Sequence, residues 1–175
     1  MTDNPTDNLI LVDEHDKQIG TAEKIHVHEQ GLLHRAFSIL VFNSKNEILL
    51  QQRAKSKYHC GGLWTNTCCS HPRNGELLDA AIHRRLKEEM GFDCELKKTA
   101  NFIYKAKFDN GLTEHEHLHV FTGLFDGKCS PNPEEADDCK WISQEELRKD
   151  VEKNPEKYTY WFRLILEKLN QPIQP

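Results

Sequence analysis

One helical segment, residues 76–90, constrains the fold of this chain more than any other stretch. It reads E-L-L-D-A-A-I-H-R-R-L-K-E-E-M, is rich in helix-forming residues and stops at Gly91, a residue type that often ends helices. Leu78, Ile82 and Leu86 recur every four residues and form one apolar stripe. Such a helix buries one face against a second layer, and the rest of the sequence predicts that this layer is a β-sheet.

Apolar, β-rich runs lie on both sides of this helix. We expect strands at residues 9–12, 37–42, 48–50, 102–108, 114–125 and 140–142. Ser143 and Glu146 have the spacing of a capping box, which predicts a further helix, and an amphipathic helix is expected at about residues 155–169. The chain shows no repeat or linker, so strands around a central helix, with helices at the end, predict a mixed α+β sandwich in one domain spanning residues 1–175.

Composition narrows the class of protein. A chain of 175 residues with 37% hydrophobic residues is long enough for one domain with a substantial core. Its net charge of -5 argues against a surface built chiefly to bind nucleic acid or an anionic membrane. Residues 1–8 are polar and no apolar run approaches the roughly 18 residues of a membrane span, so we predict a cytoplasmic protein.

The stretch T-N-T-C-C-S-H-P, residues 65–72, places two adjacent cysteines near a histidine. Adjacent cysteines rarely bond to each other, because a disulfide needs well-separated Cα atoms and the intervening peptide is rigid. Cys68 and Cys69 are therefore interpreted as buried small residues, metal ligands or a reactive thiol beside His71. In the cytosol the six cysteines are expected to be mostly reduced, and none has the C-x-x-C spacing of a zinc ribbon.

The charged residues of the 76–90 helix allow two interpretations. Arg84 and Glu88 are four residues apart, as are Arg85 and Glu89, which is typical of a salt-bridged surface helix. The longer register instead resembles the Nudix box, G-x5-E-x7-R-E-U-x-E-E-x-G-U, in which U is a bulky apolar residue. The matching residues are Glu76, Arg84, Leu86, Glu88, Glu89, Gly91 and Phe92. Ser70 replaces the first Gly of the box, and Arg85 replaces a Glu that supplies much of the metal binding in Nudix hydrolases.

Together with T-N-T-C-C-S-H-P, this degenerate box resembles the type I isopentenyl-diphosphate Δ-isomerases. Further matching motifs cover nearly the whole chain: G-L-L-H-R-A-F-S at 31–38, L-L-Q-Q-R at 49–53, L-W at 63–64, F-I-Y-K-A at 102–106, E-H-E at 114–116 and Y-W-F at 160–162. The resemblance implies a Nudix-like α/β/α sandwich with a mixed sheet, in which the loop–helix–loop at about 70–92 binds metal and diphosphate. It also implies reversible conversion of isopentenyl diphosphate to dimethylallyl diphosphate for isoprenoid biosynthesis.

The resemblance assigns the reacting groups. It implies that Cys69 and Glu116 flank the substrate, that Tyr104 assists proton transfer beside the carboxylate, and that Trp161 faces a tertiary carbocation. Such residues suit the chemistry, because an unactivated alkene is a weak base that needs a proton donor at one end and a base at the other. Water would capture the cation, so we expect the apolar stripe of the last helix to help close the pocket.

The same resemblance implies two metal sites. One has three histidines and two carboxylates, His28, His34, His71, Glu114 and Glu116, a donor set suited to Mg²⁺, Mn²⁺ or Zn²⁺. His26 is an alternative to His28 as its first ligand. On a strand, residues 114 and 116 point to one face, whereas His115, His117 and His119 point to the other and are interpreted as structural.

The second implied ion is Mg²⁺, held by Glu89 and the backbone carbonyl of Cys69 and bridged to the substrate diphosphate. The basic residues that match diphosphate contacts are Lys24, Arg53, Lys57 and Arg85. The predicted partner is therefore a small diphosphate rather than nucleic acid or a membrane. The oligomeric state is not specified by the sequence.

Two rival functions stay open at this stage. A Nudix pyrophosphohydrolase would share the fold, but it would keep a carboxylate in place of Arg85 and would have no use for Cys69. A non-catalytic zinc-binding module would explain the many cysteines and histidines, but it predicts paired C-x-x-C motifs that the chain lacks.

Overall fold

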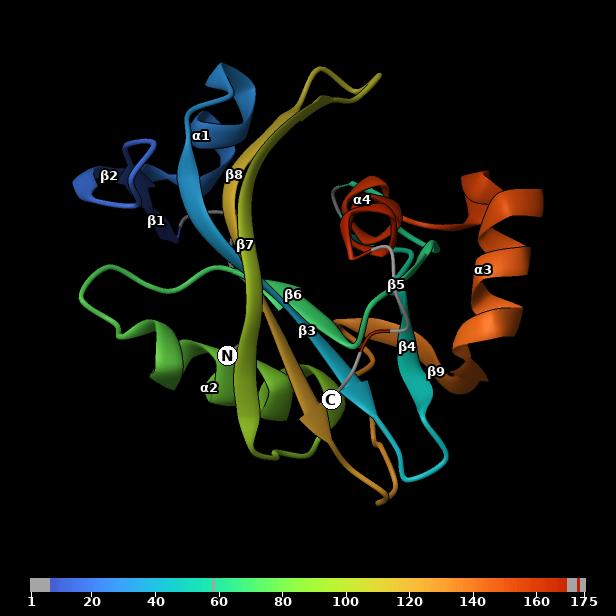
Figure 1. Cartoon of the computed structure of the whole chain (residues 1–175). Helices are drawn as coiled ribbons and strands as arrows, with labels where there is room; N and C mark the ends of the chain where they lie inside the picture. The colour runs from blue at the N-terminus through green and yellow to red at the C-terminus, as the bar shows by residue number, and fades with distance from the viewer. Residues whose placement is uncertain (1–6, 58, 170–172, 174–175) are drawn as a thin grey trace.

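A computed structural model describes residues 7–57, 59–169 and 173 of the chain. In this part of the chain, nine strands join in one mixed sheet and four α-helices pack around it (Figure 1). The strands are β1 (Asn8–Val12), β2 (Gln18–Glu23), β3 (His34–Phe42), β4 (Glu47–Arg53), β5 (Trp64–Thr65), β6 (Cys68–Ser70), β7 (Leu96–Lys107), β8 (Thr113–Leu124) and β9 (Ala136–Ser143). The helices are α1 (Lys24–Gln30), α2 (Leu78–Met90), α3 (Gln144–Lys153) and α4 (Tyr160–Lys168), with a 3₁₀ turn at Pro155–Lys157.

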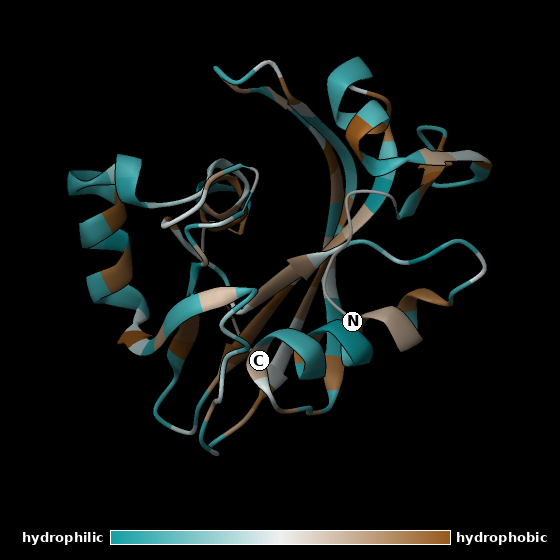
Figure 2. Ribbon diagram, turned by 180° about the vertical axis from the view of Figure 1, so that it is seen from behind, coloured by the Kyte–Doolittle hydropathy of each residue, from teal (hydrophilic) through white to brown (hydrophobic). Residues whose placement is uncertain are grey.

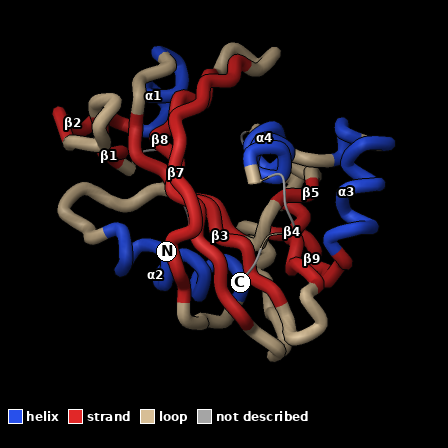
Figure 3. Tube along the Cα trace, in the orientation of Figure 1, coloured by secondary structure: helices blue, strands red, loops and turns tan. Residues whose placement is uncertain are grey.

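Strand β3 organises the sheet. It runs parallel to β8 and antiparallel to β1, β4 and β6, while β7 pairs with β8 and β9 pairs with β4. Its burial on both sides explains the unbroken apolar run of residues 39–42, because a central strand covered on both faces has no solvent-facing position. Figure 3 shows this central strand among the others, with helices on either side.

Side chains on the two faces of β3 pack into two separate hydrophobic cores. Leu40 and Phe42 point into a core that includes Phe162 and Ile165 of α4, whereas Ile39 and Val41 point into a core beneath α2. The cores occupy opposite sides of the sheet, and Figure 2 shows brown, hydrophobic segments along the strands between the helices. This arrangement confirms the expected α/β/α sandwich with a mixed sheet.

All six predicted strands form, most of them longer than predicted, and Ser143 caps α3 by accepting a hydrogen bond from the Glu146 amide at 3.2 Å. Four short elements were not predicted, namely β2, α1, β5 and β6. The expected helix at 155–169 is divided, because Tyr158 and Thr159 are extended before α4 begins. The amide of Thr159 donates to the Trp64 carbonyl at 3.0 Å, which ties this break to the sheet.

Among the described cysteines, Cys129 and Cys139 form a disulfide, and the other four are free thiols. The disulfide was not predicted, whereas the free state of Cys68 and Cys69 agrees with the sequence interpretation. The disulfide links the loop after β8 to β9.

Gly91, the glycine that ends α2, has a structural requirement that gives a testable prediction. Its φ is +76°, and a Cβ placed there would lie 2.6 Å from the Ser130 carbonyl oxygen. Gly75 has a similar φ of +79° but no atom within 4 Å of such a Cβ. We expect Gly75→Ala to lower the free energy of unfolding by about 1 kcal/mol through left-handed strain alone. Gly91→Ala should lower it by roughly 1–3 kcal/mol more because of overpacking. Urea denaturation measures both values, and equal losses would contradict the role given to the Ser130 contact.

Candidate active site

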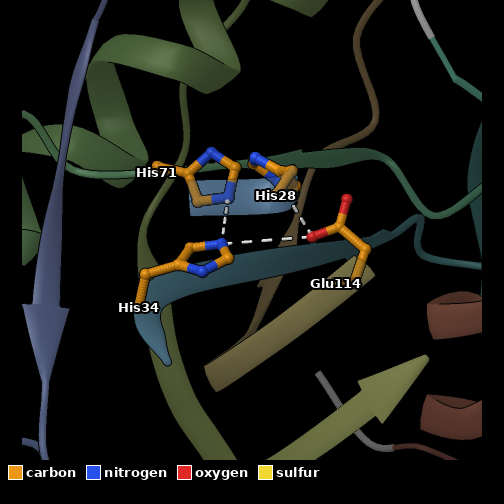
Figure 4. Close-up of side chains that lie close together, drawn as sticks. All are labelled: His28, His34, His71 and Glu114. Carbon is orange, nitrogen blue, oxygen red and sulfur yellow. Dashed lines mark hydrogen bonds and ion pairs between the residues drawn. The ribbon is translucent and has the colours of Figure 1, made fainter. Parts of the chain in front are cut away.

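A cluster of histidines and carboxylates lies where α1, β3, β8 and the loop after β6 meet (Figure 4). His28 Nε2 lies 3.1 Å from Glu114 Oε2, and His34 Nε2 lies 3.2 Å from His71 Nε2. Glu116 Oε1 is 3.3 Å from His71 Nε2 and 3.9 Å from His34 Nε2. The structure therefore brings together all five residues of the predicted three-histidine, two-carboxylate site.

Backbone contacts orient two of these imidazoles. Nδ1 of His28 donates to the Lys24 carbonyl at 2.7 Å, and Nδ1 of His34 donates to the Leu32 carbonyl at 2.9 Å. A neutral imidazole with its proton on Nδ1 presents a lone pair at Nε2. Because Nε2 of His34 faces another ring nitrogen and carboxylate oxygens, acceptor atoms converge on one point. Such a donor set fits a divalent cation.

The pKa values of the two buried carboxyl groups, Glu114 and Glu116, are shifted in opposite directions. Burial opposes ionisation of Glu114, but hydrogen bonds from His28 and His59 hold its pKa well below the usual range. Burial, reinforced by the neighbouring Glu114 charge, raises the pKa of Glu116 well above the usual range. Burial also lowers the pKa of His34 to about 4, so its ring is neutral near pH 7. Two carboxylates with opposite shifts are typical of sites that carry out acid–base chemistry.

His26 and His28, the two alternatives for the first ligand of the predicted metal site, lie in different environments. His28 is buried on the side of α1 that faces β8, whereas His26 is exposed. The helix period explains this separation, because residues two apart on a helix point in different directions. The structure thus brings His28 into the cluster and leaves His26 outside it.

Strand register determines which of the adjacent cysteines faces the cluster. Cys69 pairs with Ser38, and both His34 and Tyr104 pair with Glu116, so these side chains lie on one face of the sheet. Cys68 pairs with Ile39 and is fully buried in the core beneath α2.

Cys69 lines a small, partly open cavity. Its wall also contains Lys24, Arg53, His71, Glu114, Glu116 and Trp161 from the predicted site. Burial raises the pKa of the Cys69 thiol to about 12, so this group carries its proton at neutral pH. Tyr104 is buried on the same face, and burial with the nearby Glu116 charge raises its pKa well above the usual range. The wall of one cavity therefore contains both a protonated thiol and the carboxyl group of Glu116.

The indole of Trp161 closes one side of this cavity. Its Nε1 donates to Thr65 Oγ1 at 3.0 Å, which fixes the ring on α4 against β5. The ring centroid lies 5.3 Å from the Arg53 guanidinium carbon and 5.7 Å from the His59 ring centroid. Trp161 is only 4% exposed, as expected for a residue that excludes water. The last helix thus contributes Trp161 to the cavity wall, and its action as a lid stays a prediction.

Lys57, Arg85 and Glu89 lie in a neighbouring ionic network rather than in the cavity wall. Arg85 donates to Glu88, Glu89 and Glu135 at 2.9, 2.8 and 3.0 Å, and Lys57 pairs with Glu135. The two regions adjoin, since Ser70 and His71 line both the main cavity and a smaller one beside Arg85.

Two residues of this region were not predicted. His59 Nε2 lies 2.9 Å from Glu114 Oε1, and Glu135 accepts hydrogen bonds from both Arg85 and Lys57. His59 stands two residues after Lys57 in a loop, so no strand or helix period places it near β8. Glu135 is about fifty positions from Arg85, and only the tertiary fold joins them.

Comparison with known proteins gives the family. The Nudix domain profile matches residues 32–162. The chain is 55% identical to Isopentenyl-diphosphate Delta-isomerase 2 of Aromatoleum aromaticum, over 93% of this chain and 86% of that protein. It is 54% identical to the Photorhabdus laumondii protein of the same name, over 93% of this chain and 92% of that protein.

Solved structures support the fold. DR0079 from Deinococcus radiodurans aligns with a TM-score of 0.69 at 20% identity, covering 84% of this chain and 90% of that chain. The MutT protein of Methanosarcina mazei aligns with a TM-score of 0.64 at 18% identity, covering 79% and 93%. In the described part of the chain, every helix is too short or too polar to cross a bilayer. Identity over nearly the full length, with the Nudix profile across most of the chain, shows that this protein belongs to the isopentenyl-diphosphate Delta-isomerase family and contains a Nudix domain.

Proposed function

We propose that the chain acts as one domain in the cytoplasm and interconverts isopentenyl diphosphate and dimethylallyl diphosphate for isoprenoid biosynthesis. The observation that carries this proposal is the cavity whose wall contains Cys69, Glu116 and the ring of Trp161. Moving a double bond requires one proton to be added at a carbon and another to be removed from a different carbon. A hydrolase has no need of a half-buried thiol that shares a cavity with a carboxyl group.

In this mechanism the two groups exchange protons through the substrate. One of Cys69 and Glu116 protonates the terminal alkene carbon, which leaves a tertiary cation on the neighbouring carbon. The other removes a proton from the methylene group on the opposite side of that cationic carbon, and the double bond forms there. The roles reverse in the opposite direction. After one turnover the donor lacks a proton and the acceptor holds one, so the pair must reset before the next. Tyr104, opposite Glu116 across β7 and β8, is suited to assist that transfer.

Metal and diphosphate binding complete the proposal. Residues His28, His34, His71, Glu114 and Glu116 would hold one divalent ion, Mn²⁺, Mg²⁺ or Zn²⁺, whose charge favours the ionised form of the carboxylates. Glu89 and the Cys69 carbonyl would hold Mg²⁺ next to the diphosphate. Lys24 and Arg53 in the cavity wall, with Lys57 and Arg85 in the adjoining network, supply the positive charge that an anionic substrate needs.

The test is incubation of the purified protein with isopentenyl diphosphate and Mg²⁺ or Mn²⁺ in deuterated buffer, followed by proton and phosphorus NMR. We expect the allylic isomer with deuterium incorporated and the diphosphate intact. Release of inorganic phosphate would favour a Nudix hydrolase instead. An unchanged substrate with bound metal would favour the non-catalytic module.

Trp161 provides a specific prediction. If its ring stabilises the cation, Trp161→Leu should lower kcat about 30-fold, because a desolvated cation–π interaction is worth roughly 2 kcal/mol. KM should change much less, since the charge exists mainly in the transition state. Trp161→Phe keeps an aromatic face and should retain more activity than Trp161→Leu. Steady-state kinetics on variants with unchanged circular dichroism measures this, and equal kcat for the two variants would reject the role.

A further inference from the structure

A second group of metal-binding side chains lies on the opposite face of β8 from the active site. His117 and His119 alternate with Glu116 along the strand, so they point towards the α2 side of the sheet. Asp16, in the turn between β1 and β2, reaches the same point. One ligand atom from each of these three residues lies within 4.8 Å of the others.

The two imidazoles are buried with incomplete hydrogen bonding. His117 is 6% exposed and His119 is 3% exposed. Within the described residues, Nδ1 of His117 and both ring nitrogens of His119 lack a hydrogen bond of acceptable geometry. Nε2 of His119 nevertheless lies 3.0 Å from Asp16 Oδ2. Buried polar atoms without partners carry a free-energy cost, and a bound ion would remove it.

Arg35 orients the carboxylate of this group. Its Nε donates to Asp16 Oδ1 at 2.7 Å, and its guanidinium also donates to the Asp16 backbone carbonyl. Oδ2 is therefore directed at His119, in the way that outer hydrogen bonds orient metal ligands. Asp16 has a φ of +63°, an uncommon backbone conformation for a residue other than glycine.

The spacing and chemistry of the donors suit a transition metal. In a tetrahedral zinc site with bonds of about 2.0–2.1 Å, neighbouring ligand atoms lie roughly 3.3 Å apart. The observed distance between His119 Nε2 and Asp16 Oδ2 is close to this value. Two imidazole nitrogens with one carboxylate favour Zn²⁺, Co²⁺ or Ni²⁺ over Mg²⁺.

We propose that Asp16, His117 and His119 form a second metal site, selective for Zn²⁺ and related ions, which fastens the β1–β2 turn to β8. The site is separate from the His28, His34 and His71 cluster and does not depend on the proposed isomerase activity. It revises the interpretation of His117 and His119 as purely structural. Since β2 leads directly into α1, the bound ion would also restrain the segment that carries Lys24 and His28.

Metal stoichiometry tests this proposal. Full-length protein is stripped with a chelator, titrated with Zn²⁺ against a chromophoric competitor, and analysed for bound zinc by mass spectrometry after desalting. The double variant His117→Ala/His119→Ala should bind one equivalent fewer than the wild type. Asp16→Asn, at a partly exposed turn, should weaken that equivalent about tenfold or more without threatening the fold. When the double variant is titrated with Co²⁺, one set of the visible absorption bands seen with the wild type should be missing.

His115→Ala is the matched control. His115 lies on the same face of β8, but its Nδ1 donates to the Gly31 carbonyl at 2.9 Å and it lies outside the cluster. We expect the His115→Ala variant to bind as much zinc as the wild type. Equal stoichiometry in the wild type and the double variant would overturn the proposal. So would an equal loss in His115→Ala, or unaltered zinc affinity in Asp16→Asn.

Discussion

Replacing Cys69 by alanine is expected to lower kcat by about 10³-fold, while Cys68→Ala keeps most of the activity. Removal of a general acid or base typically lowers the rate by 10²–10⁴-fold. Only Cys69 faces the cavity, whereas Cys68 is fully buried beneath α2. Glu116→Gln should cause a loss of similar size, because the amide cannot exchange a proton as the carboxyl group does.

The two cysteine variants control for each other, since they remove the same atom from adjacent positions. Cys68→Ala should cost about 1 kcal/mol of stability through lost packing, with little effect on kcat. Initial rates from the NMR assay and thermal denaturation of both variants separate these effects. Equal kinetic losses at the two positions would contradict the assignment of Cys69 as the reacting thiol.

The second large effect is expected for Arg85→Glu, which restores the carboxylate that the Nudix box of a hydrolase contains. Arg85 is 2% exposed and contacts Glu88, Glu89 and Glu135. Replacement would leave four carboxylates together, of which Glu135 still pairs with Lys57 and Glu88 still pairs with Arg84. Breaking buried ion pairs in this way costs about 3–5 kcal/mol. We therefore expect a metal-free variant that unfolds much more readily than the wild type.

Divalent metal should partly reverse this loss, because four carboxylate groups can bind Mg²⁺ or Mn²⁺. The melting temperature of the variant should rise far more with Mg²⁺ than that of the wild type. Lys87→Glu is the control, since it makes the same charge change at an exposed position of α2 and should cost less than about 1 kcal/mol. Equal destabilisation by both substitutions would contradict the proposed role of the buried network.

The same substitution addresses the choice between isomerase and hydrolase. We expect the wild type to leave the P–O–P bond of isopentenyl diphosphate and of nucleoside diphosphate compounds uncleaved at saturating Mg²⁺. Arg85→Glu should weaken substrate binding without producing an efficient hydrolase, because no water-activating arrangement is restored with it. Phosphate release by the wild type that persists after Cys69→Ala would support the hydrolase.

The sequence predicted the main elements because their signals are local. The apolar period of α2, the apolar runs of the strands and the capping box at Ser143 depend only on neighbouring residues. The short strand β6 was missed, because three residues carry too little pattern to be recognised. It is nevertheless the element that separates the environments of Cys68 and Cys69.

Residues of the candidate site could be predicted only where they lie within recognisable sequence motifs. His71, Glu114 and Glu116 lie in recognisable stretches, and the structure brings them together. His59 reaches Glu114 through a loop, and Asp16 reaches His119 through a turn, so neither contact follows from spacing. Such contacts depend on how the sheet curls and which loops fold onto it, which local patterns do not encode.

Side chains along β8 point alternately to the two faces of the sheet, and this alternation limits which insertions and deletions the strand can accept. Glu114 and Glu116 serve one face of the strand, while His117 and His119 serve the other. Inserting or deleting a single residue between positions 114 and 116 would exchange the faces of every residue beyond it. Both groups of ligands would then be separated at once. Point substitutions in this strand can alter one group and leave the other in place, but a one-residue insertion or deletion between positions 114 and 116 displaces both.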